Sequence, residues 1–91
     1  MPELEWRWTA REDLRVIFEY ISDDNPAAAL ALLEEIEVKV GHLPEQPQAY
    51  RVGRMIGTRE MVVRPNYLVI YRETPDLISI LRVLHAAQMW P

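Results

Sequence analysis

The chain has 91 residues, a formal net charge of −4 and no cysteine, so we expect one domain over residues 1–91 without disulfides. Its two histidines are far apart in the sequence and it has no glycine-rich phosphate loop, so neither a metal nor an organic cofactor is expected. No stretch approaches the roughly 20 apolar residues of a membrane span, and the N-terminus lacks the apolar run of a signal peptide. These features predict a cytoplasmic protein with no membrane partner.

Charge is divided unevenly along the chain. Residues 1–45 hold eleven Asp and Glu against four Arg and Lys, whereas residues 46–91 hold three against six, all six being arginine. Arginine pairs well with carboxylates and phosphates, so the C-terminal half is suited to an acidic partner. The negative total charge argues against avid, non-specific binding of nucleic acid.

The N-terminal third predicts a strand followed by two helices. Apolar and charged residues alternate over residues 4–8, which indicates a short strand. Thr9 and Glu12 have the spacing of a capping box, so a helix should begin at Ala10. Its apolar stripe consists of Leu14, Ile17, Phe18 and Ile21.

A second helix is expected to start after Asn25, a favourable N-cap, with Pro26 at its first position, and to run to about Leu43. Its apolar stripe consists of Leu30, Leu33, Ile36, Val40 and Leu43. The two helices should form a hairpin over a shared core.

Residues 43–57 have two prolines and two glycines and predict a loop, with room for a short edge strand and with Arg51 and Arg54 exposed. Residues 58–85 contain three runs rich in β-formers, joined at Pro65-Asn66 and at residues 74–76, which predicts a three-stranded antiparallel meander. The expected fold class is α+β: an N-terminal strand and a two-helix hairpin packed on an antiparallel sheet of about four strands.

Strand alternation assigns residues to the two faces of this sheet, if Arg64 pairs with Tyr67 and Glu73 with Leu77. One face then carries Arg59, Met61, Val63, Leu68, Ile70, Arg72, Ile78, Ile80, Arg82 and Leu84. Both faces are apolar at their centres, and two helices cover only one of them. The other face is expected to bind a partner protein.

The order of strand, helix hairpin and meander resembles the RelE/ParE superfamily, the toxins of bacterial type II toxin-antitoxin systems. The resemblance covers nearly the whole chain and is carried by "DLRVIFEYISDDNPAAA", "GTRE", "PNYLVIYR" and "ILRVLHAAQMWP". It implies a toxin that a cognate antitoxin neutralises. The antitoxin is expected to bind with apolar and acidic side chains on Arg59, Met61, Leu68, Ile70, Arg72, Ile80 and Arg82.

Two activities occur in the superfamily. RelE-like members cut messenger RNA on the ribosome, whereas ParE-like members are linked to poisoning of DNA gyrase. Leu68 and Met61 stand where RelE-like members tend to have basic residues, so the resemblance favours a gyrase inhibitor that is not an enzyme. The alternatives are a ribosome-dependent endoribonuclease, for which Arg59, Arg82 and His85 would be the catalytic groups, and a non-toxic binding module.

Each of these candidate groups also has a structural interpretation. His85 is either an acid or base or a strand-end histidine bonded to backbone, and alternation places it on the face opposite Arg59 and Arg82. Arg59 and Arg82 either form internal salt bridges, with Glu73 or Glu60, or bind an acidic antitoxin segment or a phosphate. Trp90 either closes the core or contacts a ligand.

Overall fold

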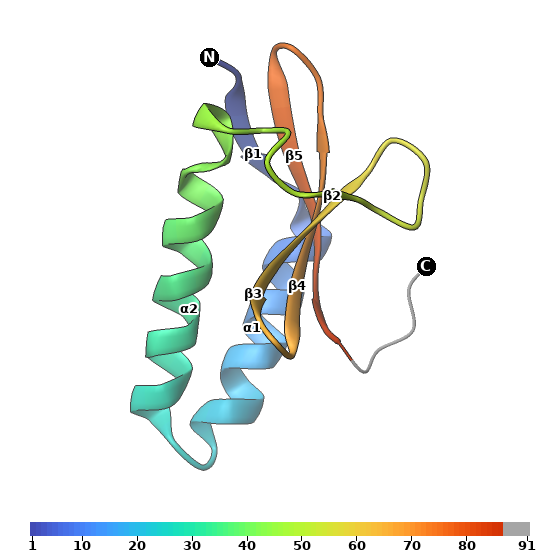
Figure 1. Ribbon diagram of the computed structural model, residues 1–91. Helices are drawn as coiled ribbons and strands as arrows, with labels where there is room; N and C mark the ends of the chain where they lie inside the picture. Colours follow the sequence, from blue (N-terminus) through green and yellow to red (C-terminus); the bar gives the residue numbers. More distant parts are fainter. Residues whose placement is uncertain (87–91) are drawn as a thin grey trace.

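The computed structural model describes residues 1–86, and Figure 1 shows two helices on one side of a twisted sheet. The predicted α+β class is confirmed. Trp90 lies outside the described residues. The elements are β1 (Glu3–Trp6), α1 (Trp8–Ser22), α2 (Pro26–Gly41), the 3-10 turn η1 (Leu43–Glu45), β2 (Arg51–Val52), β3 (Arg59–Arg64), β4 (Tyr67–Glu73) and β5 (Leu77–His85).

The sheet has five strands in the order β1-β5-β4-β3-β2 and is mixed, whereas an antiparallel sheet of about four strands was expected. The predicted meander is confirmed, because β3, β4 and β5 pair antiparallel in sequence. β1 pairs parallel with β5, with Leu4 opposite Ile78. Alternation in a sequence predicts a strand but not its neighbour, so the parallel pair could not be foreseen.

The start of α1 differs from the predicted capping box. The helix begins at Trp8, its N-cap Arg7 makes no side-chain cap, and the Thr9 hydroxyl donates instead to the Leu81 carbonyl at 2.7 Å. This hydrogen bond gives a partner to a backbone carbonyl at the edge of β5. Because the two residues are far apart in the chain, local sequence spacing does not predict it. Trp8 is left 76% exposed on the first turn.

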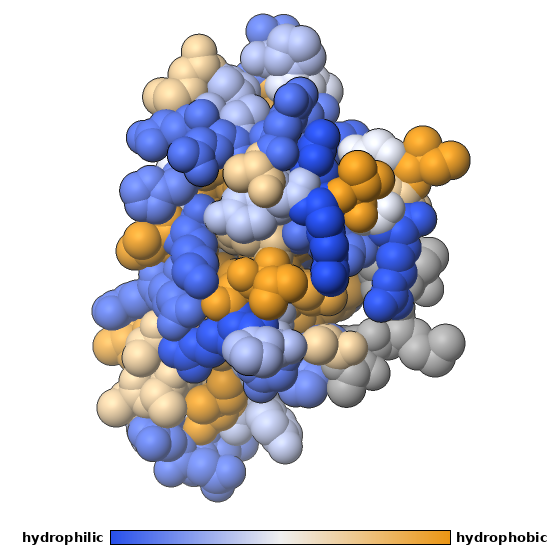
Figure 2. Space-filling model, in the orientation of Figure 1, coloured by the Kyte–Doolittle hydropathy of each residue, from blue (hydrophilic) through white to orange (hydrophobic). Residues whose placement is uncertain are grey.

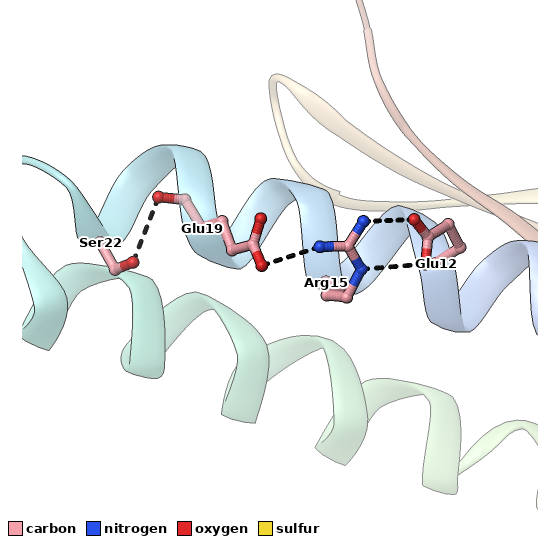
Figure 3. A network of polar contacts seen from close by, with 4 residues as sticks. All are labelled: Glu12, Arg15, Glu19 and Ser22. Carbon is pink, nitrogen blue, oxygen red and sulfur yellow. Dashed lines mark hydrogen bonds and ion pairs between the residues drawn. The ribbon is translucent and has the colours of Figure 1, made fainter.

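A network of charged side chains lies on the exposed side of α1 (Figure 3). The Arg15 guanidinium donates to the Glu12 carboxylate one turn before it and to Glu19 one turn after it. The hydrogen bond from Arg15 lowers the pKa of Glu12. Exposed pairs of this kind add little to stability, so the packing of the opposite face holds the helix in place.

The cap of α2 is confirmed, because the Asn25 side chain accepts from the Ala28 amide at 3.0 Å and Pro26 opens the helix. The helix ends at Gly41 rather than near Leu43, where a 3-10 turn containing Pro44 takes over. Its buried residues are Ala29, Leu32, Ile36 and Val40. Leu30, placed in the core by its spacing, is 49% exposed, because α2 is apolar nearly all round and periodicity alone does not fix its inward face.

Two irregularities change which strand residues share a face. Arg64 pairs with Tyr67 as predicted, but the register shifts between Val62 and Arg64, so Met61 stands opposite Val69. A second shift follows Ile70, which brings Ile80 opposite Tyr71. Each β-bulge inserts one residue and reverses the alternation beyond it.

Met61 and Ile80 therefore belong to the core beneath the helices, with Val69, Tyr71 and Ile36. We call the opposite side of the sheet the second face. It carries Glu60, Val62, Leu68, Ile70, Arg72, Arg82 and Leu84. The prediction that Met61, Leu68, Ile70 and Ile80 share one face of the sheet is wrong.

The inward side of α2 can be tested with a matched pair of truncations. Ile36→Ala removes a side chain that is 0% exposed and should lower the free energy of unfolding by about 2–5 kcal/mol. Leu30→Ala should cost under about 1 kcal/mol, because that side chain is already half in solvent. Urea denaturation of both variants measures this, and an equal or larger loss for Leu30→Ala would contradict the observed orientation of α2.

Candidate functional site

The residues expected to bind the antitoxin do not form one surface. Met61, Ile70 and Ile80 are each 0% exposed. Leu68 is half-buried on the second face, where Arg72 is exposed. Arg82 stands opposite Ile70 on the same face, with its side chain 34% exposed, so Leu68, Arg72 and Arg82 are the members of the predicted set that have surface available to a partner there.

Arg59 is partly buried at the start of β3 and is bonded to its neighbours. Its Nη1 donates to the Tyr50 carbonyl at 2.7 Å, and its Nε lies 3.7 Å from the Glu73 carboxylate. The internal salt bridge with Glu73, one of the two alternatives for this residue, is confirmed. The neighbouring Tyr71 hydroxyl donates to the Pro47 carbonyl at 2.7 Å, and burial raises the pKa of Tyr71 to about 12. This corner of the sheet is therefore a packed joint between β3, β4 and the preceding loop.

Arg82 forms a two-pronged ion pair with Asp13 of α1. Its Nε and Nη2 lie 2.7 Å and 3.0 Å from the two carboxylate oxygens. This hydrogen bonding raises the pKa of Arg82. The predicted internal pairing is thus confirmed, but with Asp13 in place of Glu73 or Glu60. Sequence patterns do not indicate this partner, because Asp13 follows Glu12 on a helix where every acidic residue is expected to face solvent.

Asp13 also completes the outer edge of β5. The strand pairs with β1 as far as Ile80, and beyond that point the Leu81 carbonyl accepts from Thr9. The Val83 amide then donates to the Asp13 carboxylate at 2.9 Å. Side chains of α1 therefore take over the hydrogen bonds that a longer β1 would have made. A shallow pocket at this junction is lined by Trp8, Thr9, Glu12, Asp13 and Arg82.

His85 lies at the far end of the sheet from Arg59. It stands opposite Tyr67, with ring centroids 5.3 Å apart in an edge-to-face arrangement, whereas Arg59 stands opposite Tyr71. Four residues of β4 separate the two positions, or roughly 13 Å along the strand. His85 shares the face of Arg59, contrary to the prediction, because the bulge in β3 reverses the alternation. Arg82, opposite Ile70, lies on the face opposite His85 as predicted, but it does not share the face of Arg59, which was also predicted.

The loop before β3 is organised by buried polar groups that sequence analysis missed. The Glu60 carboxylate, only 4% exposed, pairs with Arg51 at 3.1 Å and accepts from the Arg54 amide at 3.1 Å. The buried Thr58 hydroxyl donates to the Met55 carbonyl at 2.7 Å. The only sequence signal was an acidic residue inside an apolar strand. Arg51 and Arg54 are exposed, as predicted.

Within residues 1–86 no three His, Cys, Asp or Glu side chains are grouped so as to hold a metal ion. In the same part of the chain, no helix combines the length and apolarity needed to cross a bilayer.

Comparison with known proteins identifies the family. The model of the ParE toxin of type II toxin-antitoxin systems, parDE, matches residues 4–90. The chain belongs to the ParE toxin family. The expected membership of the RelE/ParE superfamily is thus confirmed, and the chain is a toxin of a type II toxin-antitoxin system, close to ParE.

Individual relatives agree with this assignment. The Sinorhizobium fredii protein Y4kP is 41% identical over 88 residues, which cover 93% of this chain and 91% of the relative. Toxin RelE2 of Caulobacter vibrioides is 33% identical over 89 residues, covering 98% and 100%. The structure of the chromosomal ParDE system from P. aeruginosa matches with a TM-score of 0.83 at 26% identity, covering 93% of this ParE-family chain and 96% of the matched chain.

The role of Asp13 at the β5 edge leads to a stability prediction. Asp13→Ala leaves the Arg82 guanidinium and the Val83 amide without this partner, so the free energy of unfolding should fall by about 2 kcal/mol. Glu12→Ala makes the same change of charge one residue earlier and removes only exposed contacts, so its effect should be much smaller. Chemical denaturation of both variants decides the matter, and equal losses would refute a structural role for Asp13.

Proposed function

We propose that this ParE-family toxin stops growth by binding DNA gyrase, without cutting RNA, and that a cognate antitoxin neutralises it. The observation that carries the proposal is the separation of the three candidate catalytic groups. Arg82 pairs with Asp13, Arg59 with Glu73 and the Tyr50 carbonyl, and His85 lies beside Tyr67.

Cleavage of RNA requires these groups to meet at one phosphate. A base must reach the ribose 2′-hydroxyl, an acid must reach the leaving oxygen, and cations must surround the charge that develops, each within about 3 Å of its atom. The positions opposite Arg59 and His85 are four residues apart along β4, and Arg82, opposite Ile70, lies on the other face of the sheet. The arrangement is better suited to binding a protein than to acid-base chemistry.

The relatives support the same proposal. The matching family model describes ParE toxins, and the structure from P. aeruginosa is of a ParDE toxin-antitoxin system. One relative is named toxin RelE2, so a ribosome-dependent endoribonuclease is the second candidate function to be tested. A partner antitoxin is common to both.

Expression of the toxin without its antitoxin distinguishes the two activities. We expect induction of the DNA-damage response, inhibition of purified gyrase in a supercoiling assay, and intact transcripts. His85→Ala should retain growth inhibition, because binding gyrase needs no proton transfer, whereas a nuclease would lose about 10²- to 10⁴-fold in rate. Cleaved transcripts, together with loss of toxicity in a folded His85→Ala protein, would establish the nuclease instead.

For the antitoxin we propose the second face, where Leu68 is half-buried, Val62 is 42% exposed and Arg72 is exposed. These residues offer apolar contacts edged by a positive charge, as expected for an apolar and acidic antitoxin segment.

A substitution on this face tests where the antitoxin binds. Leu68→Asp should weaken antitoxin binding at least about tenfold, because it places a charge within the apolar contact. Val16→Asp, at a 50% exposed valine on α1, is the matched control and should leave binding unchanged. Titration calorimetry gives both affinities and circular dichroism verifies the fold; unchanged binding by a folded Leu68→Asp protein would remove the second face from the interface.

A further inference from the structure

The end of β2 and the loop that joins it to β3 expose large apolar side chains. Ile56 is 97% exposed, Val52 73% and Met55 38%. Figure 1 shows the loop projecting from the sheet on the side away from the helices, and Figure 2 shows strongly apolar side chains on it beside strongly hydrophilic ones. Loops usually present polar turn residues to water, so this composition needs a physical reason.

The loop holds these side chains outward in a fixed shape. The Gly53 amide donates to the Thr58 carbonyl at 2.8 Å, and the Thr58 hydroxyl and amide both donate to the Met55 carbonyl. A Cβ at Gly53 would stand 2.3 Å from the Thr58 hydroxyl oxygen, and Gly57 has a φ of 83°, so both positions favour glycine. With the Glu60 carboxylate bonded to the Arg54 amide, the loop is already ordered in the isolated toxin.

We propose that residues 52–57, here called the tip, insert into an apolar pocket on the folded target protein of the toxin. The proposal rests on the proposed function, that the toxin acts by binding a protein. An extended antitoxin segment needs a groove to lie in, whereas a convex and ordered tip fits a concave pocket, where side chains that fill pockets contribute most of the binding energy.

The charges around the tip predict the charge at the rim of the pocket on the target protein. Arg51 of β2 precedes the tip, Arg54 lies within it, and the Nε of Arg72 lies 3.7 Å from the point where a Cβ would stand on Gly57. The buried Glu60 carboxylate offsets the charge of Arg51, and Arg54 and Arg72 remain as exposed cations. The exposed rim is therefore positive, and the target pocket should be apolar at its centre and acidic at its edge.

The experiment compares Ile56→Asp with Val38→Asp, which makes the same kind of change at a 61% exposed position on α2. Both are produced with the antitoxin, and growth inhibition, gyrase inhibition and antitoxin affinity are measured for each. We expect Ile56→Asp to need at least about 30-fold more toxin for half-inhibition of gyrase and to lose growth inhibition, with unchanged antitoxin affinity. Arg54→Glu should act in the same direction, and Val38→Asp should behave as wild type.

Unchanged growth inhibition by Ile56→Asp would overturn the proposal, and so would a loss of antitoxin affinity, which would assign the tip to the antitoxin. Antitoxin affinity and circular dichroism together exclude misfolding as the cause of lost toxicity. If the wild-type toxin stops growth without inhibiting gyrase, the identity of the target is wrong, while loss of growth inhibition in Ile56→Asp alone still supports the tip as the target contact.

Discussion

The placement of α1 on the last strand depends on the Asp13 carboxylate, and much of the candidate site follows from it. β1 is too short to pair with all of β5, so the strand edge beyond Ile80 needs other hydrogen-bond partners. Thr9 and Asp13 supply them, and the same carboxylate binds the guanidinium of Arg82. An arginine that would otherwise be suited to a phosphate thus becomes part of the joint between helix and sheet.

The two β-bulges decide which side chains a partner can reach. Without them, Met61 and Ile80 would lie beside Leu68 and form an apolar face open to a partner; with them, both are packed under the helices. On the sheet and its loops, the available apolar surface includes Leu68 and Val62 on the second face and the loop that carries Ile56. Two separate surfaces are compatible with two different protein partners, one for neutralisation and one for toxicity.

Local signals in the sequence were sufficient for most of the fold. Asn25 followed by proline marks the start of α2, and the turn at Pro65-Asn66 sets the hairpin of β3 and β4, because both depend on neighbouring residues alone. Bulges and the parallel pairing of β1 are set by tertiary packing and leave no such signal. For the same reason Asp13 and Glu60, whose partners come from the fold, were missed as organising residues, although the family motifs correctly indicated a type II toxin.

A double-mutant cycle between Asp13 and Arg82 tests the central claim, that this pair is a structural joint, most directly. Asp13→Asn, Arg82→Gln and the double variant are compared with the parent by chemical denaturation. The observed two-pronged geometry predicts a favourable coupling of about 1–2 kcal/mol. Effects that add within about 0.3 kcal/mol would contradict it, and would mean that Arg82 is available for another role.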